Sequence, residues 1–168
     1  EQKMDMLLDA RENAGQLEEI MNDLLELAEI ESGIRTLLPA PVPPVELVRP
    51  AVERHSAAAE SKHVRLEVHV WADLPRVLAD KEATRRIFEN LLSNAIRHTG
   101  HDGTVSISAT DREDRVFFCV KDTGEGIPQE DLPTSFSSFV QVGGKPGGVT
   151  GLGLALVTRL VEAQRGKV

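Results

Sequence analysis

Apolar residues recur every three or four positions between Leu7 and Ile34, which is the spacing of one face of an α-helix. They form two neighbouring rows. The first row is Leu7, Ala10, Ala14, Leu17, Met21, Leu24 and Ala28, and the second row is Ile20, Leu27, Ile30 and Ile34. The resulting face is broader than a two-stranded coiled-coil seam and suits a four-helix bundle. One helix cannot bury so broad a face alone, so we expect a partner helix from outside this sequence or from a second chain. The alternative is that the helix lies on the chain's own domain, which would then have to cover both rows.

The helical pattern ends at Ser32-Gly33, and a proline-rich stretch follows at residues 39–44. Proline lacks an amide hydrogen and interrupts a helix, so this stretch predicts a stiff linker. We therefore divide the chain into a helical segment (residues 1–38), a linker (39–44) and a domain (45–168).

Beyond the linker, segments with helical spacing and segments with strand-like alternation are mixed. Helices are predicted over residues 45–61, 81–98 and 152–163, the second with Asp80 as its N-cap. Strands are predicted over residues 64–70, 104–109 and 116–122, and a glycine-rich loop over residues 143–151. Because the order is not a regular βαβ repeat, we predict an α+β fold, a two-layer α/β sandwich, rather than a doubly wound sheet.

Composition narrows the class of protein. Hydrophobic residues make up 40% of the chain and charged residues 27%, and no apolar run approaches the roughly 18 residues of a membrane-spanning helix. The net charge is −8, and residues 1–35 hold ten acids against three bases. No basic stripe indicates nucleic acid as a partner. The single cysteine, Cys119, excludes a disulfide within the chain, and its apolar neighbours predict a buried structural thiol.

The helix predicted over residues 81–98 carries two asparagines on one face. At 100° per residue, Asn90 and Asn94 share an arc with Arg86 and Arg97, opposite the apolar arc. Asparagine disfavours a helix interior, because its amide competes for backbone hydrogen bonds. Amide oxygens suit Mg²⁺ and arginines suit phosphate oxygens, so this face is a candidate metal and phosphate site; two surface asparagines by chance is the alternative.

Two glycine-containing motifs follow. DTGEGIP (residues 122–128) places Asp122 at the end of a predicted strand, where a carboxylate can accept a hydrogen bond from an amino group such as that of adenine. GGKPGGVTGLGLALV (143–157) opens the last helix, whose free amide N–H groups can receive phosphate. It is neither a P-loop nor a dinucleotide fingerprint, because the glycine spacing differs and Pro146 follows Lys145. A plain turn and a surface loop are the alternatives.

These motifs, in this order, resemble the ATP-binding catalytic domain of bacterial sensor histidine kinases, which belong to the GHKL superfamily. NLLSNAIRHT (90–99) is similar to the family's N box, and DTGEGIP to its first glycine box. FSSF (136–139) resembles the phenylalanine box, and TGLGLALV (150–157) the second glycine box. MNDLLELAEIESG (21–33) resembles the second helix of the dimerisation and phosphotransfer domain. The resemblance covers almost the whole chain and implies the GHKL (Bergerat) ATP-binding fold.

The resemblance implies a site for ATP and Mg²⁺. Asn94 would coordinate Mg²⁺, Asn90 would line the phosphate site, and Asp122 would bind the adenine amino group. Lys145 would contact the γ-phosphate from a mobile ATP lid at about residues 140–150. The other implied nucleotide-binding residues are Arg97, His98, Gly124, Gly126, Ile127, Thr150, Gly151, Leu152, Gly153 and Leu154.

Position 90 separates two reactions within the superfamily. ATP-hydrolysing relatives are expected to carry a water-activating glutamate there, whereas Asn90 cannot act as a general base. Glu89 lies about 100° further around the helix and would polarise an incoming nucleophile instead. With Glu89 and Asn90 as its catalytic residues, the implied activity is protein-histidine kinase, in which the γ-phosphoryl group passes to a histidine and then to a response regulator aspartate.

The sequence also departs from the family. None of its five histidines lies in a sequence that resembles the phosphoacceptor box, and the chain stops where family members continue into two more strands, so we expect a catalytic fragment. The phenylalanine box carries Ser137 and Ser138 where charged residues are frequent.

By the same resemblance we expect a homodimer through the helix bundle, a response regulator receiver domain as partner, and a cytoplasmic fragment of a protein anchored in the bacterial inner membrane. A serine kinase of the anti-sigma-factor type is one alternative, although such proteins lack the dimerisation-type helix. A degenerate ATP-binding module that only docks a regulator is the other, although the intact Asn90, Asn94 and Asp122 argue against it.

Overall fold

The computed structural model describes residues 2–132, 134–136 and 152–168, and before Ile20 it describes only some of the side chains. Its elements are α1 (Gln2–Glu31), β1 (Ala40–Val42), α2 (Pro44–Ser61), β2 (Arg65–His69), β3 (Val77–Ala79), α3 (Lys81–His98), β4 (Thr104–Arg112), β5 (Arg115–Asp122) and α4 (Gly153–Ala163). Every helix and strand predicted from the sequence is present, and the two short strands β1 and β3 are additional.

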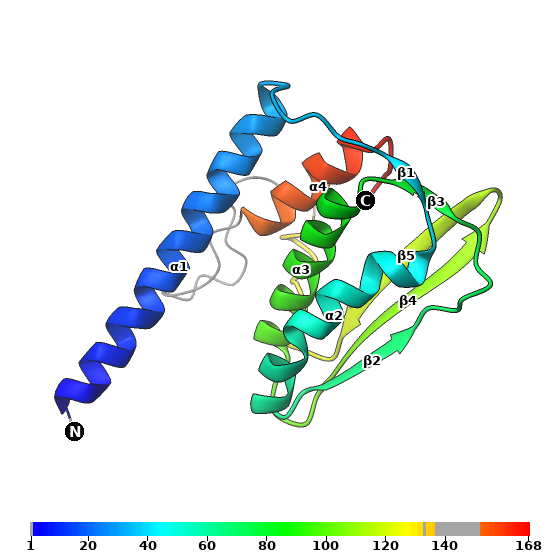
Figure 1. Cartoon of the computed structure of the whole chain (residues 1–168). Helices are drawn as coiled ribbons and strands as arrows, with labels where there is room; N and C mark the ends of the chain where they lie inside the picture. The colour runs from blue at the N-terminus through cyan, green and yellow to red at the C-terminus, as the bar shows by residue number, and fades with distance from the viewer. Residues whose placement is uncertain (1, 133, 137–151) are drawn as a thin grey trace.

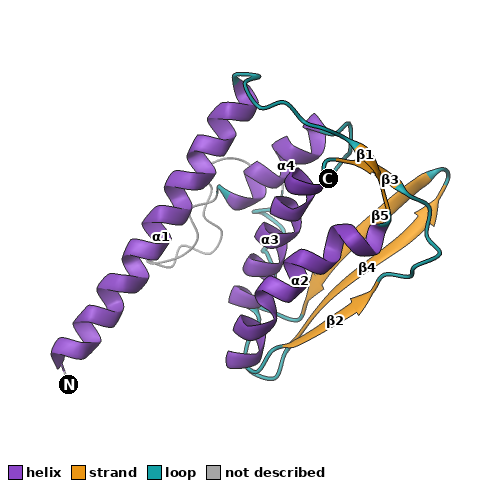
Figure 2. Cartoon of the chain, viewed as in Figure 1, coloured by secondary structure: helices purple, strands orange, loops and turns teal. Residues whose placement is uncertain are grey.

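Helices α2 and α3 lie over one face of a three-stranded sheet, which makes two layers (Figure 2). The sheet has the order β2-β4-β5, with β2 parallel to β4 and β4 antiparallel to β5. Between the two layers lies a core to which β4 contributes Val105 and Ile107, and α3 contributes Phe88 and Leu92. These side chains recur with period two on the strand and with helical spacing on α3, so each element buries one face. The predicted α+β sandwich is confirmed.

Part of the proline-rich stretch predicted as a linker is a strand. Residues Ala40–Val42 pair with β3 in antiparallel register, with Ala40 opposite Ala79. Pro41 is tolerated because β1 has a partner on one side only, so its missing amide hydrogen breaks no ladder on the other side. The stretch therefore fastens the start of α2 beside the start of α3, and the division into domains stays a prediction.

Cys119 is exposed, so the prediction of a buried structural thiol is wrong. The reason is the pleat of β5. Phe118 and Val120 point toward α2 and α3 and pack on the core, so Cys119 between them points to the other face of the sheet. Phe117, two positions before Cys119, is likewise 52% exposed. The apolar residues around Cys119 predicted the strand correctly, but they did not show that helices cover only one face of the sheet.

Helix α1 lies beside α4 (Figure 1), and its two apolar rows differ in burial. Leu27 of the second row is buried in a second cluster with α3 and α4, and Ile20 and Ile30 pack at its margin. Leu17, Met21 and Leu24 of the first row are exposed. Within α1 the second row thus packs on the chain's own domain, whereas the described part of the first row is exposed, as is Ile34 beyond the helix. Among the described residues, no helix is long and apolar enough to cross a membrane.

Candidate nucleotide site

Helix α3 presents its asparagines beside the start of α4. Asp80 caps α3 by accepting a hydrogen bond from the amide of Ala83 at 2.8 Å, which fixes where the helix begins. Asn90 and Asn94 are half-buried, and the Asn90 amide donates to the Arg86 carbonyl at 3.1 Å. A Cβ added at Gly153 would lie 3.0 Å from the Asn90 side-chain oxygen. Two motifs that are far apart in the sequence are therefore in close contact, and the glycine at 153 keeps space beside Asn90.

The first glycine motif is held against the C-terminal end of α3. Asp122, at the end of β5, is exposed, and its Oδ1 accepts a hydrogen bond from the Gly124 amide at 2.8 Å. A Cβ at Gly124 would lie 2.4 Å from the carbonyl oxygen of His98, so this position requires glycine. Gly126 has a φ of +71°, which glycine adopts without strain. The turn thus brings the Asp122 carboxylate next to the end of the helix that carries Asn90 and Asn94.

His98 and Arg97 stand at that end of α3 and are exposed. The His98 ring lies 3.3 Å from a Glu125 carboxylate oxygen, a contact that joins α3 to the first glycine motif. Lys62 donates to the carbonyl of Ile96 at 2.9 Å and to that of Arg97, which caps the negative end of the helix. Arg97 also lines an open hollow of about 390 Å³ between α2 and α3.

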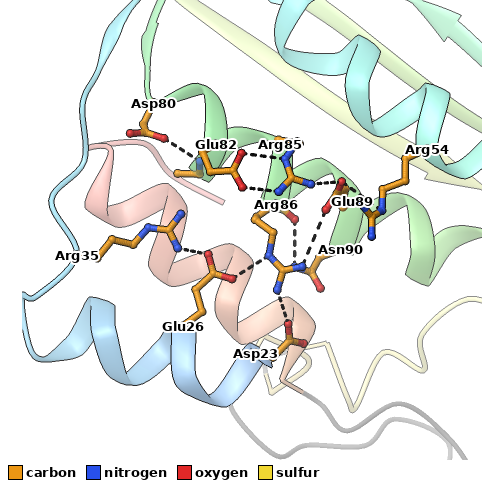
Figure 3. A network of polar contacts seen from close by, with 11 residues as sticks. Asp23, Glu26, Arg35, Arg54, Asp80, Glu82, Arg85, Arg86, Glu89 and Asn90 are labelled. Atoms are coloured by element: carbon orange, nitrogen blue, oxygen red, sulfur yellow. Dashed lines mark hydrogen bonds and ion pairs between the residues drawn. The ribbon is translucent and has the colours of Figure 1, made fainter. Parts of the chain in front are cut away.

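Glu89 has unusual surroundings for a carboxylate, because its side chain is only 8% exposed and three arginines face it (Figure 3). Arg85 donates to its Oε1, and Arg54 of α2 lies 3.6 Å from the same oxygen. Arg86 lies 4.0 Å from Oε2. Ion pairs are what allow a carboxylate to be buried in its charged form. Arg54 and Arg85 were not among the residues predicted for the site, although the i, i+4 spacing of Arg85 and Glu89 is a signal that predicts their contact.

Arg86 continues this network to α1 (Figure 3). It donates to Glu26 at 2.8 Å and to Asp23 at 2.9 Å, and Arg35 donates to the second oxygen of Glu26. Burial lowers the pKa of Arg86, but its hydrogen bond to Glu26 and the charges of Glu26, Asp23 and Glu89 outweigh burial, so the pKa is raised overall. Arg86 is therefore a fixed positive charge between two groups of acids. From helical spacing, Arg86 was predicted to lie on the phosphate face of α3, and in the structure it pairs with acids instead.

The remaining predicted residues divide into three groups. Leu152 is buried at the start of α4 in the cluster with α1, so its backbone rather than its side chain borders the site. Leu154 is half-buried, and Ile127 is 38% exposed beside Gly126. Lys145, Thr150 and Gly151 lie outside the described residues, as does the whole of the predicted lid at about residues 140–150.

The described residues fit a nucleotide with a hard cation. Gly153 leaves space beside Asn90 that a Cβ would fill, and Gly124 lets the first glycine motif pack closely on the His98 carbonyl. The side chains there that can donate or accept hydrogen bonds are the amides of Asn90 and Asn94 and the carboxylate of Asp122. Amide oxygens suit Mg²⁺, which keeps several waters and shares its remaining positions with phosphate oxygens. No group of three or more histidine, cysteine, aspartate or glutamate side chains in the described ranges could hold a metal ion by itself.

Comparison with known proteins agrees with this geometry. Residues 79–168 match the family described as "Histidine kinase-, DNA gyrase B-, and HSP90-like ATPase". The alginate biosynthesis sensor protein KinB of Pseudomonas aeruginosa is 34% identical over 164 residues, which cover 98% of this chain and 27% of KinB. The chain therefore spans about a quarter of that relative's length.

Two solved structures are similar over the same region. Full-length ShkA in complex with AMPPNP superposes with a TM-score of 0.79 at 32% identity, over 97% of this chain and 34% of ShkA. The nucleotide-free catalytic domain of the histidine kinase ThkA superposes with a TM-score of 0.67 at 28% identity, over 75% of this chain and 81% of that domain. The first similarity includes the region of α1, because it covers nearly the whole chain.

Proposed function

Since this chain belongs to the family of histidine kinase-, DNA gyrase B- and HSP90-like ATPases, we propose that it binds Mg·ATP and transfers the γ-phosphoryl group to a histidine side chain. The observation that carries the proposal is the contact that two distant segments make with α3, one at its middle and one at its C-terminal end. Asn90 lies against Gly153, and Gly124 lies against the carbonyl of His98. The similarity to sensor kinases over almost the whole chain, α1 included, supports a histidine rather than a serine as acceptor.

In this proposal each residue has a role that follows from its place. Asp122 accepts a hydrogen bond from the adenine amino group, with Gly124 and Gly126 allowing the backbone to approach the base. Asn94 coordinates Mg²⁺, and Asn90, Arg97 and His98 border the phosphates. The amides at the start of α4 face the phosphate chain, where a helix N-terminus favours negative charge. Lys145, Thr150 and Gly151 complete the site in the same proposal.

The chemical step needs positioning and charge neutralisation more than covalent chemistry from the protein. A ring nitrogen of the acceptor histidine attacks the γ-phosphorus, an N–P bond forms, and the bond from phosphorus to the bridging oxygen breaks, so ADP leaves with the electron pair. The other ring nitrogen carries a proton that becomes acidic as the ring gains positive charge. Glu89 accepts the hydrogen bond of that N–H group and takes up the proton. Mg²⁺ supplies neutralisation of the phosphate charge.

The whole protein extends this proposal. The exposed first row of α1, including Leu17, Met21 and Leu24, would pair with other helices in a dimeric bundle. The phosphoryl group would then pass from the histidine to an aspartate of a response regulator receiver domain. We propose that the whole protein is a sensor kinase anchored in the bacterial inner membrane. The part described by this sequence would lie in the cytoplasm.

The experiment mixes this chain with a separate helical bundle that bears an acceptor histidine and with ATP labelled at the γ-phosphate. We expect label on the bundle that is labile in acid and stable in base, because phosphohistidine has an N–P bond. Replacing the acceptor histidine by glutamine is the matched control and removes the label. Acid-stable label on serine, or no transfer although ATP binds, contradicts the proposal and supports a serine kinase or a docking module respectively.

A further inference from the structure

Arg86 is shared between carboxylates of two helices, α1 and α3 (Figure 3). Its Nε and Nη2 donate to Glu26 and Asp23 of α1, at 2.8 and 2.9 Å. Its Nη1 faces Oε2 of Glu89 at 4.0 Å, which is too long for a hydrogen bond. Arg86 therefore makes its direct contacts with α1 and only a long ion pair with the residue proposed to assist phosphoryl transfer.

The two oxygens of Glu89 are not equivalent. Oε1 takes the hydrogen bond from Arg85 and the ion pair with Arg54. Oε2 has no hydrogen-bond partner within the described part of the chain, and Arg86 lies 4.0 Å from it. Oε2 is thus the oxygen that can accept a hydrogen bond from an incoming nucleophile. Its availability depends on where Arg86 points.

We propose that Arg86 is a positioning residue for Glu89, and that Asp23 and Glu26 keep Oε2 open by holding Arg86 on α1. The inference rests on the proposed function, and in particular on the role of Glu89. An arginine and a glutamate at i and i+3 can pair directly on a helix, and a charge-assisted hydrogen bond would need Arg86 to move only about 1 Å closer. Without the negative charge of its acceptors on α1, Arg86 closes onto Oε2. The placement of α1 is thereby linked to the reactivity of Glu89.

The first test uses the transfer assay with the separate histidine-bearing bundle. For D23N/E26Q we expect the rate of phosphoryl transfer to fall about fivefold, because the ion pair between Arg86 and Glu89 must then open before each transfer. We expect the affinity for ADP to stay within about twofold of the wild-type value. E18Q/E29Q is the matched control, because it removes the same charge from exposed positions of α1 and keeps the wild-type rate. Adding R86Q to D23N/E26Q restores the rate. A variant that had merely lost the docking of α1 would not be rescued, so an unrescued loss overturns the proposal.

The second test does not depend on catalysis. A double-mutant cycle with R86Q and E89Q, followed by urea unfolding, measures the coupling between these two side chains. We expect a larger coupling in the D23N/E26Q background than in the wild-type background, because Arg86 then contacts Glu89 directly. Equal coupling in both backgrounds overturns the inference whether or not phosphoryl transfer is observed. Absence of transfer to histidine together with increased coupling instead refutes the proposed function and leaves the arrangement of Arg86 standing.

Discussion

Gly124→Ala tests the contact between the first glycine motif and α3. The new Cβ would lie 2.4 Å from the His98 carbonyl oxygen, 2.9 Å from the His98 carbonyl carbon and 2.8 Å from Asp122 Oδ1. These atoms belong to backbone or to the side chain that would bind adenine, so the turn must move away from α3 by about 1 Å to restore ordinary contact distances. Overpacking of this kind costs about 1–3 kcal/mol.

That cost corresponds to a fall in melting temperature of about 2–12 °C, at about 2–4 °C per kcal/mol for a chain of this size. The assays are thermal unfolding followed by circular dichroism, and ADP titration by calorimetry, in which we expect at least about tenfold weaker binding because Asp122 is displaced. Gly100→Ala is the matched control, since its Cβ meets no atom within 4 Å. If Gly124→Ala matches Gly100→Ala in both melting temperature and ADP affinity, the close packing of this turn on α3 is refuted.

Three further predictions concern single residues. Asp122→Asn keeps an oxygen for the Gly124 amide but loses the charge, so ADP affinity falls about tenfold in calorimetry; unchanged affinity contradicts the adenine role. For Asn94→Ala we expect Mg²⁺ to increase the affinity for ATP less than it does in the wild type. An equal increase in both proteins refutes the metal role of Asn94. Backbone hydrogen bonds from Ala83 and Leu38 outweigh burial and lower the pKa of Asp80, so Asp80→Ala costs about 1 kcal/mol of unfolding free energy at pH 7. The pKa of Asp80 is lower in the folded than in the unfolded protein, so the stability difference between wild type and Asp80→Ala is present above about pH 4 and disappears as the pH falls through the folded-state pKa. A stability difference that does not change with pH contradicts the cap.

The secondary structure could be predicted because each element follows one period. The cap at Asp80 and the helical spacing of α3 fix that helix closely, and alternation identifies β4 and β5. Strands β1 and β3 were not predicted, because three-residue strands are too short for a periodic signal and proline argues against one of them. The whole of α2 and β2 separates these two strands in the chain, so their pairing depends on tertiary contact, which no local pattern encodes.

The site was predictable in outline from residue types and their order. A ligand or a close contact explains the residue types at three positions, Asn90, Gly124 and Gly153. The structure places the segments of both glycines in contact with α3. The ion pairs that join α3 to other helices were not predictable, because Arg54, which pairs with Glu89, lies on α2, and the partners of Arg86, Asp23 and Glu26, lie on α1. On α1 these acids belong to the strongly acidic stretch of residues 1–35, and nothing in their spacing indicates an arginine of α3 as partner. Their partners depend on how α1 packs on α4, and that packing is set by Leu27 in a cluster assembled from three helices.

The central claim is that α3, the first glycine motif and the start of α4 form one nucleotide site. Backbone amide NMR shifts recorded during a titration with the non-hydrolysable analogue AMPPNP and Mg²⁺ test this most directly. We expect the amides of Asn94, Gly124, Gly126 and Gly153 to shift together with one dissociation constant, while amides of the exposed face of β5, such as Phe117, stay in place. Shifts confined to one of the three segments, or fitted by different constants, would contradict a single site.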